Sequence, residues 1–437
     1  MSSMQTDDLV EQPEPTVPDV PQGAAGSLIG YAKNYWARVK GGELGSIPAI
    51  VGLVVISAFF AIVHKGFLSA YNIEALVFQA AAVIIMAMGL IFVLLLGEID
   101  LSAGTTGGLC AAIMAVLLLR HGWNEILAML VGLAMGMIIG FLMGWLRAKI
   151  GIPSFVITLA TFLGFQGITL IIIGGQGSVT LPSGPGENRD SLLLKIENNF
   201  VPLWLGWVLL AVVIIGYALV KLNDANNRRR AGLRAVPLSV IGVKVLALAA
   251  LGALFVYIMG INRILTHNAF FDAKSEGMPW SVVLIMVLFV IWNFVLTRTR
   301  YGRHIYALGG NEEATRRAGI AINRVRISVF VICSGMAAIS GIVAASQLSS
   351  VQSNAGGGNT LLLAVGAAVI GGTSLFGGRG RMIDAVLGGL VVTVITNGMS
   401  NLIKGTNNSG WQQIVTGAVL LLAAGFDAVV RSRSRAR

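Results

Sequence analysis

Long apolar runs recur along most of the chain, and short polar or glycine-containing stretches separate them. A run of about 20 apolar residues is what an α-helix needs to cross a bilayer. The pattern predicts about twelve such spans, at residues 47–63, 73–96, 102–119, 125–146, 153–173, 202–220, 240–261, 280–297, 327–345, 360–376, 383–400 and 411–430. Lipid offers no partner to a free backbone N–H or C=O, so the sequence predicts an all-α, polytopic transmembrane bundle of about 10–12 spans.

Composition and charge agree with a membrane protein. The chain is 55% hydrophobic and 12% charged, with a mean hydropathy of +0.80, whereas soluble domains carry about 25% charged residues. A net charge of +11 could indicate nucleic-acid binding, but basic residues also gather in the cytoplasmic loops of membrane proteins. With the N-terminus inside, most of the 31 lysines and arginines fall in inside loops. We therefore expect cytoplasmic termini, contact with membrane lipids and no nucleic-acid partner.

Polar ends flank the predicted transmembrane domain, which covers residues 47–430. Residues 1–46 predict a largely disordered cytoplasmic tail, because residues 1–22 hold four prolines and five acidic residues but no basic residue. Residues 31–40 mix aromatic and basic side chains, which suits either a segment on the inner membrane surface or an ordinary linker. Residues 431–437 predict a basic cytoplasmic tail.

Glycine recurs every fourth residue in the expected span 125–146, which places these glycines on one helix face where two backbones can approach. They are Gly132, Gly136, Gly140 and Gly144. The spacing favours packing against a neighbouring helix of the same chain, with a dimer face as the alternative. Cys110 and Cys333 fall inside apolar runs, so we expect packing residues and no disulfide.

Two glycine-rich segments resemble each other. GEIDLSAG at 97–104 and GGTSLFGG at 371–378 share the order glycine, three residues, leucine, two residues, glycine. Each follows an apolar run and ends at the same expected side of the membrane. An internal duplication of the kind seen in transporters would explain the likeness, and so would chance in a glycine-rich chain. The pattern leaves open whether these segments cross the membrane or are re-entrant.

A charged segment, RYGRHIYALGGNEEATRRAGI at 300–320, lies between two apolar runs and cannot lie in lipid. Asn311 suits the N-cap of a short helix, and Gly319 suits its left-handed end. The acidic pair at 312–313 precedes the basic pair at 316–317 by four residues, which forms two favourable i,i+4 pairs aligned with the helix dipole. Gly309 and Gly310 are expected to permit a sharp turn before it. The segment predicts a stiff, two-turn surface helix for a partner protein, or an ordinary charged loop.

This segment resembles the cytoplasmic coupling segment of the permeases of bacterial ABC sugar importers, most closely the xylose permeases and more distantly the ribose and galactose ones. GEIDLSAGTTGG at 97–108, PSFVITLATF at 153–162 and GGTSLFGGRG at 371–380 resemble further stretches, and the likeness runs from about residue 50 to residue 430. The resemblance implies the type II ABC importer permease fold in the bacterial plasma membrane. It also implies a separate ATPase that binds ATP and Mg²⁺, an extracytoplasmic sugar-binding protein and a second permease copy, most simply as a homodimer.

The resemblance further implies that residues 298–326 form a coupling loop whose helix docks on the ATPase. The residues expected to take part are Gly309, Gly310, Asn311, Glu312, Glu313, Ala314, Arg316, Arg317 and Gly319. Replacing Glu313 or Gly310 is then expected to abolish transport while the protein still inserts. This chain is not expected to be an enzyme or to hold a cofactor. It has no Gly-Lys dipeptide for a phosphate-binding loop, and no H-E-x-x-H or C-x-x-C metal motif.

Residues of the substrate pathway are less clearly marked. Asp100 suits the N-cap of a helix that begins at Leu101, while Glu98 and Asp100 together could act in gating or sugar contact. Polar and aromatic residues in apolar runs are further candidates, although hydrogen bonds between helices explain them equally well. They are Thr158, Thr161, Phe162, Gln166, Asn359 and Thr360.

The sequence thus predicts a permease that carries a monosaccharide, with D-xylose as the leading cargo, by alternating access driven by a partner ATPase. Ribose, another carbohydrate or a branched-chain amino acid are the alternative cargoes. A more distant alternative is an ion-coupled secondary transporter, which needs acidic or histidine side chains inside the membrane. The acids that come near are Glu98, Asp100, Asp384 and Asp427, all at the ends of expected spans.

Overall fold

The computed structural model describes residues 46–175, 177–181, 191–233, 235–261, 276–403 and 410–418, with the single positions 421 and 425. Several expectations lie outside these residues. They are the N-terminal tail before residue 46 with its segment at 31–40, most of the last expected span beyond residue 418, and the basic tail at 431–437.

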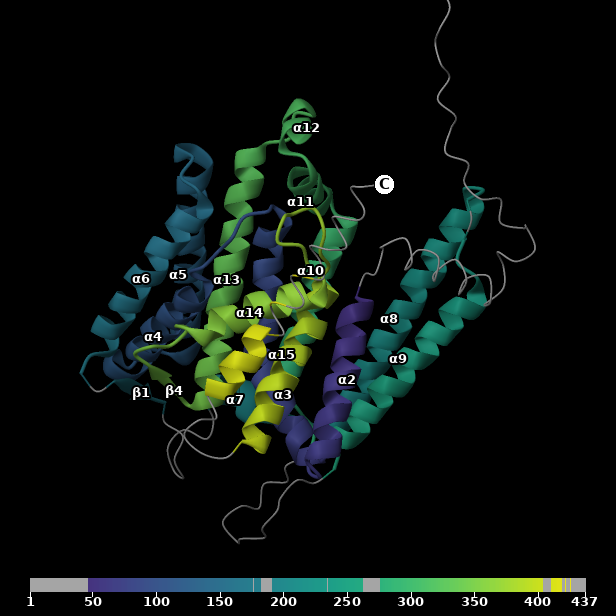
Figure 1. The fold of residues 1–437 in the computed structure, drawn as a ribbon, viewed down its shortest axis with the longest axis horizontal. Coiled ribbons are helices and arrows are strands. Elements are labelled where there is room, and N and C mark those ends of the chain that lie inside the picture. The colour runs from purple at the N-terminus through teal and green to yellow at the C-terminus, as the bar shows by residue number, and fades with distance from the viewer. Residues whose placement is uncertain are drawn as a thin grey trace, which may run out of the picture. The chain divides into compact units, whose positions relative to one another are not determined.

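Helices make up nearly all of the described structure (Figure 1). In chain order they are α2 (Ile47–Val63), α3 (Ala70–Leu95), α4 (Ala103–His121), α5 (Glu125–Trp145), the π-helix η1 (Leu146–Ile150), α6 (Ser154–Ile173), α7 (Leu192–Asn198), α8 (Leu203–Arg230), α9 (Leu238–Met259), α10 (Trp280–Arg298), α11 (Arg300–Gly310), α12 (Glu312–Arg317), α13 (Ile322–Leu348), α14 (Asn359–Gly371) and α15 (Met382–Leu402). Among the described residues, nine helices are long and apolar enough to cross a membrane. The predicted all-α transmembrane bundle is confirmed.

Two short antiparallel sheets complete the described part. Strand β1 (Ser178–Thr180) pairs with β4 (Ser350–Gln352), and β2 (Phe200–Val201) pairs with β3 (Met278–Pro279). Each has two strands of two or three residues, so they join connecting segments and do not change the fold class.

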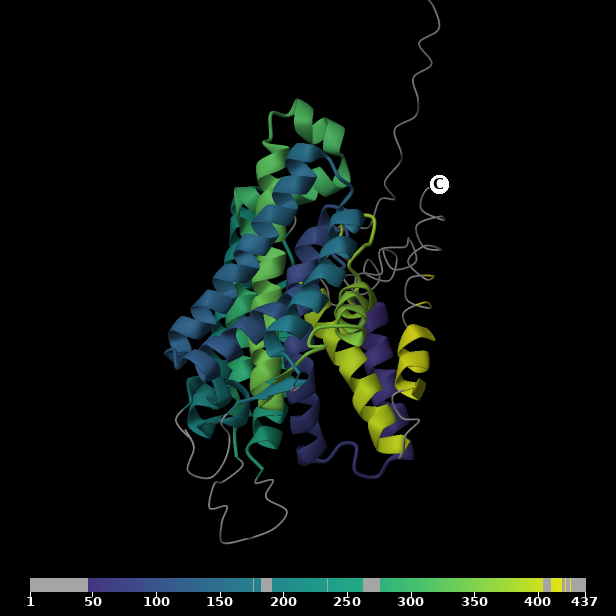
Figure 2. The same cartoon turned by 90° about the vertical axis from the view of Figure 1, so that its left-hand side faces the viewer.

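Helices α3, α4, α13 and α15 form the core of the bundle. In their most apolar windows, 72% of the residues of α3, 67% of those of α4 and of α15, and 61% of those of α13 are buried, against 22% for α6 and 11% for α10. Helix α13 packs most extensively against α5 and α3, and Figures 1 and 2 show it running beside both. The outer helices instead present apolar side chains outward, as lipid contact requires.

The glycine face of α5 packs against α13 of the same chain. A Cβ on Gly140 would lie 2.4 Å from the carbonyl oxygen of Phe330, and one on Gly144 would lie 2.8 Å from the Cα of Ile327. Only glycine allows such an approach, so the prediction of packing within the chain is confirmed. Cys110 and Cys333 are buried and unpaired, as expected of packing residues.

Helix α14 is shorter than the span expected at 360–376. It has 13 residues, or about 20 Å at 1.5 Å per residue, whereas the hydrocarbon core is about 30 Å thick. It ends at Gly371 because Gly372 adopts a φ of 119°, which favours glycine. The apolar residues that follow, to position 376, form turns and loop and not helix.

The stretch before α14, residues 353–358, is irregular and packs on α4. A Cβ on Gly108 would lie 1.9 Å from the carbonyl oxygen of Ala355, and one on Gly104 would lie 2.3 Å from that of Gly356. Non-helical backbone at membrane depth is tolerated where protein covers it. The segment 353–371 is therefore a broken element, part irregular chain and part helix.

The chain divides into two compact units. The smaller contains Met1–Glu43 and Leu210–Gly252, and its described part is built from portions of α8 and α9, where a Cβ on Gly252 would lie 2.3 Å from Cδ1 of Leu210. The larger contains Leu44–Leu209 and Ala253–Arg437. All residues considered below belong to the larger unit.

Candidate functional site

The charged segment at 300–320 forms two short helices, α11 and α12, beyond the end of α13 (Figures 1 and 2). Thr299 caps α11, since its hydroxyl accepts a 3.1 Å hydrogen bond from the backbone N–H of Gly302. Asn311 caps α12 in the same way, through a 2.9 Å bond from the N–H of Ala314. At the other end Gly319 has a φ of 77°. The predicted caps of the 311–319 helix are confirmed.

The two predicted i,i+4 ion pairs of α12 are also present. Arg316 lies 3.2 Å from Glu312, and Arg317 lies 3.3 Å from Glu313. Exposed pairs of this kind stabilise a helix by only about 0.3–0.5 kcal/mol each. Because both pairs lie within α12, they favour its helical form but do not attach it to the rest of the bundle. Only Thr315 of α12 is buried. Most of its surface is thus available to a partner.

An arginine that the sequence reasoning did not single out ties α12 to the bundle. Arg326, in the second turn of α13, is 8% exposed, and its guanidinium lies 2.9 Å from the Glu312 carboxylate. Its Nε lies 3.0 Å from Oε1 of Glu98, which also accepts a 2.7 Å hydrogen bond from Arg147. The available signal was an arginine inside the start of a long apolar helix, where a buried charge requires a partner.

These side chains form an ion-pair network from Arg147 through Glu98, Arg326 and Glu312 to Arg316. It connects the start of η1 and the α3–α4 junction to α12. A cavity of about 640 Å³ lies beside the network, and basic side chains dominate its charged lining. Glu98 is therefore held by two arginines, which accounts for a buried carboxylate at this position.

The prediction that Gly309 and Gly310 form a turn is wrong. Both end helix α11, and the chain turns at Asn311, whose φ is −158°. Gly309 is required for a different reason, because a Cβ there would lie 1.7 Å from the carbonyl oxygen of Leu95 and 2.8 Å from the amide nitrogen of Gly378. A Cβ on Gly310 would meet nothing within 4 Å.

The two similar glycine-rich segments, 97–104 and 371–378, contact each other beside Gly309. The N–H of Gly378 donates a 2.9 Å hydrogen bond to the carbonyl of Leu95, and a Cβ on Gly377 would lie 2.9 Å from the nitrogen of Gly97. We call the contact of Leu95–Gly97, Gly309 and Gly377–Gly378 the glycine joint. The joint thus brings the beginning of the first segment to the end of the second, while the end of the first, at Gly104, packs against Gly356.

Tyr306 adds a side-chain contact to the joint. Its hydroxyl donates a 2.6 Å hydrogen bond to the carbonyl of Gly380. Burial raises the pKa of the Tyr306 phenol, so the group stays neutral and keeps its proton for this bond. Helix α11 thus packs against the second glycine-rich segment through Gly309 and is bonded just beyond that segment, at Gly380, through Tyr306.

The prediction that Asp100 is the N-cap of a helix beginning at Leu101 is wrong. Helix α4 begins at Ala103, and Ser102 occupies its N-cap position. The Asp100 carboxylate accepts hydrogen bonds from the backbone N–H and the hydroxyl of Ser102, at 2.9 and 2.7 Å, and the thiol of Cys333 lies 3.5 Å away. A side chain bonded to the N–H two residues later makes an Asx-type turn that leads into the helix.

The polar candidates on α6 bond mainly within the protein. Thr158 donates to the carbonyl of Ser154 at 2.9 Å, and Thr161 to that of Ile157 at 2.9 Å, so both hydroxyls have helix backbone partners. Phe162 is half-buried. The amide of Gln166 reaches Gly357, where a Cβ would lie 3.1 Å from Nε2, close to the start of α14.

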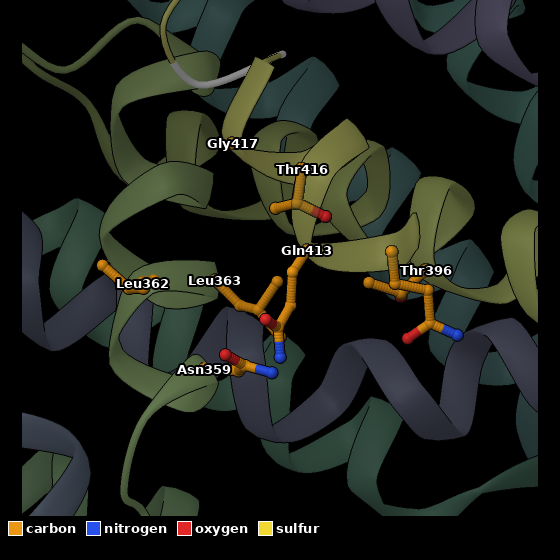
Figure 3. A pocket seen from close by; sticks show the side chains of 8 residues that line it. Asn359, Leu362, Leu363, Thr396, Gln413, Thr416 and Gly417 are labelled. Atoms are coloured by element: carbon orange, nitrogen blue, oxygen red, sulfur yellow. The ribbon is translucent and has the colours of Figure 1, made fainter. Parts of the chain in front are cut away.

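The candidates on α14 lie elsewhere. Thr360 is half-buried in its first turn. Asn359 lines a cavity of about 150 Å³ between α14, α15 and the helical residues 410–418 (Figure 3). The sequence candidates therefore do not form one site, and the cavity includes residues that the sequence reasoning missed. These are Leu362, Leu363, Thr396, Gln412, Gln413, Thr416 and Gly417.

Comparison with known proteins adds the family. Residues 72–424 match the model of a family described as "Branched-chain amino acid transport system / permease component". The xylose transport system permease protein XylH of Escherichia coli (strain K12) is 34% identical over 402 residues, which cover 91% of this chain and 95% of that protein. The protein of the same name in Haemophilus influenzae is 32% identical over 393 residues, covering 89% and 98%.

The ribose import permease protein RbsC of Escherichia coli (strain K12) is 29% identical over 383 residues, covering 87% of this chain and 92% of that protein. No solved structure matches the chain. These matches bear out the resemblance carried by the charged segment and the glycine-rich segments. The chain therefore belongs to this family of permease components, as a multi-pass membrane subunit of a transport system and not an enzyme.

Proposed function

We propose that this chain is the membrane-spanning subunit of an ATP-driven importer of a monosaccharide, with D-xylose as the leading cargo. The support for a sugar is that the XylH relatives are xylose permeases and the RbsC relatives are ribose permeases. Ribose, another carbohydrate or a branched-chain amino acid, which the family description names, are the alternatives.

One observation carries the ATP-driven part of the proposal: α12 is exposed, capped at both ends and tied at its base to the bundle. A partner ATPase that grips α12 would move it as a rigid piece when ATP binding closes the ATPase. Arg326 would pass that displacement to Glu98, and Gly309 would pass it to both glycine-rich segments. The ends of α3, α4 and α15 would then shift together, which is what alternating access requires.

The proposal includes the partners of such a transporter. A separate ATPase binds ATP and Mg²⁺, an extracytoplasmic sugar-binding protein delivers the cargo, and a second copy of this chain completes the pathway. The assembly lies in the bacterial plasma membrane with both termini of this chain in the cytoplasm. The distribution of basic residues supports that orientation.

Uptake of radiolabelled D-xylose tests the proposal, in cells that lack this chain and in cells that regain it. An ionophore that collapses ion gradients but spares ATP separates the energy sources, and excess ribose or leucine tests the cargo. We expect uptake that depends on the chain, persists with the ionophore and resists both competitors. Uptake lost with the ion gradient would overturn the ATP-driven proposal.

A variant of α12 makes the same experiment specific to coupling. Glu313→Arg reverses the charge of a side chain that is 63% exposed and that forms an ion pair with Arg317 in the same helix. We expect the variant to insert normally and to lose transport. Normal uptake by this variant would contradict docking through α12, even if the wild type carries xylose.

A further inference from the structure

The cavity at the start of α14 has the chemistry of a binding site. Five of its lining side chains are uncharged but polar: Asn359, Thr396, Gln412, Gln413 and Thr416. Figure 3 shows Gln413 extending across the cavity toward Asn359, with Leu363 beside them. Amides and hydroxyls can each donate and accept hydrogen bonds. Such a lining suits a ligand that also does both.

The position of the cavity in the fold is a second observation. Its lining includes Asn359, the first residue of the 13-residue helix α14, which directly follows the irregular stretch 353–358. In secondary transporters, substrate sites are typically built where a membrane helix is interrupted, because the break frees backbone and side-chain groups inside the bundle, and the same physical reason applies to an interrupted helix here. Asn359, the first residue of α14, places its amide at this break.

Thr416 provides a third, independent observation. It is 7% exposed, and its Oγ1 has no hydrogen-bond partner among the described residues. A threonine in a helix commonly bonds to the carbonyl four residues earlier, and a buried hydroxyl left without a partner is unfavourable. A ligand hydroxyl in the cavity would supply the missing bond.

We propose that this cavity binds the transported monosaccharide through hydrogen bonds to Asn359, Gln413 and Thr416. The inference rests on the proposed function and adds the place and chemical class of the cargo. No charged side chain lines the cavity in the part of the chain that the structure describes, whereas an amino acid brings an ammonium and a carboxylate that need charged or dipolar partners. The uncharged hydroxyls of a sugar match the amides and hydroxyls, and Leu362 and Leu363 offer an apolar wall to its C–H groups.

The size of the cavity agrees with a small sugar. Its volume of about 150 Å³ equals that of an apolar cavity known to hold benzene, a ring of six carbon atoms. A pentose ring with its hydroxyls is somewhat larger than benzene, and this cavity is only partly enclosed. A disaccharide would extend well beyond it.

Equilibrium binding of tritiated D-xylose to the full-length permease in lipid nanodiscs tests the site. Thr416→Val keeps the side-chain shape and removes the hydroxyl, so we expect binding to weaken roughly 3- to 10-fold, the loss of one hydrogen bond. Gln413→Leu should weaken it by a similar factor. Thr169→Val makes the same chemical change in α6, where the hydroxyl bonds to the Phe165 carbonyl at 2.8 Å, and should leave binding unchanged.

The outcomes separate this inference from the proposed function. Equal affinity of wild type and Thr416→Val, or no binding of xylose to wild type, overturns the site, while ATP-driven sugar uptake by wild-type cells leaves the importer proposal standing. Binding of leucine in place of xylose overturns the sugar assignment of the cavity. A change of oligomeric state in Thr416→Val with unchanged sugar binding assigns the cavity to contact between two copies, and also overturns the inference.

Discussion

Gly309 has room for a hydrogen atom and for little else. The nearest obstacle to a side chain is the carbonyl oxygen of Leu95, 1.7 Å from where a Cβ would stand, and a backbone atom cannot move aside as a flexible side chain can. Gly309→Ala should therefore push α11 away from the joint and cost roughly 1–3 kcal/mol. Thermal unfolding of the purified full-length protein in detergent measures this loss.

Gly310→Ala is the matched control, because a Cβ at that position would meet nothing within 4 Å. Its unfolding temperature should stay at the wild-type value. Equal destabilisation of the two variants would show that helix-end flexibility, and not the approach to Leu95, determines the role of both glycines. The sequence suggested a structural requirement for glycine at both positions, and the structure restricts it to Gly309.

Individual side chains differ in how far the sequence could predict them. The Asn311 cap and the Glu312–Arg316 and Glu313–Arg317 pairs involve residues three or four positions apart, so helix geometry alone fixes them. The pairing of Arg326 with Glu98 joins residues far apart in the chain, and no local rule contains it. Gly309 was misassigned because turns and close backbone contacts both select glycine.

At the scale of elements, Arg326 connects α12 to the α3–α4 junction. Arg326→Met removes the charge between Glu98 and Glu312. The loss of folding stability should stay below the roughly 3–5 kcal/mol that a fully broken buried ion pair costs, because Glu98 still has Arg147 as a partner at 2.7 Å. We expect the variant to assemble but to transport poorly, with ATP hydrolysis continuing in the reconstituted transporter.

Arg324→Met serves as the comparison, since Arg324 is an exposed residue two positions earlier in α13 and lines the 640 Å³ cavity beside the network, as Arg326 does. That variant should keep transport and hydrolysis linked. The ratio of sugar carried to ATP hydrolysed, measured in proteoliposomes with the partner ATPase and binding protein, tests the connection. A normal ratio in Arg326→Met would exclude the network as a route of coupling.

At the scale of the whole molecule, the orientation in the membrane follows from charge. If basic loops lie inside, α12 faces the cytoplasm and the β1–β4 pair faces outward. A cysteine at Gln352 should then react with a membrane-impermeant thiol reagent added to intact cells, and a cysteine at Glu313 only after the cells are broken. Cys110 and Cys333 are buried, so the wild type should give little background. The reverse pattern of labelling would overturn the orientation.

The expected spans and the observed helices agree best where apolar runs are long and uninterrupted. They differ at α14, because hydropathy continues through Leu375 and Phe376 while the backbone turns at Gly372. A window that averages hydropathy cannot detect a break set by the conformation of one glycine. The cavity at the start of α14 was missed for a different reason, since its walls come from three separate segments, at 359–363, at Thr396 and at 412–417.

The glycine joint has a consequence for how this protein can change over time. Its contacts are made largely by backbone atoms of three distant segments, so each segment limits the residues that the other two can accept. Substitutions in contact are not independent. A bulkier residue at Gly97, Gly309 or Gly377 is therefore expected to be tolerated only with compensating changes in another of the three segments, and the segments should be inherited as a set when parts of such permeases are exchanged.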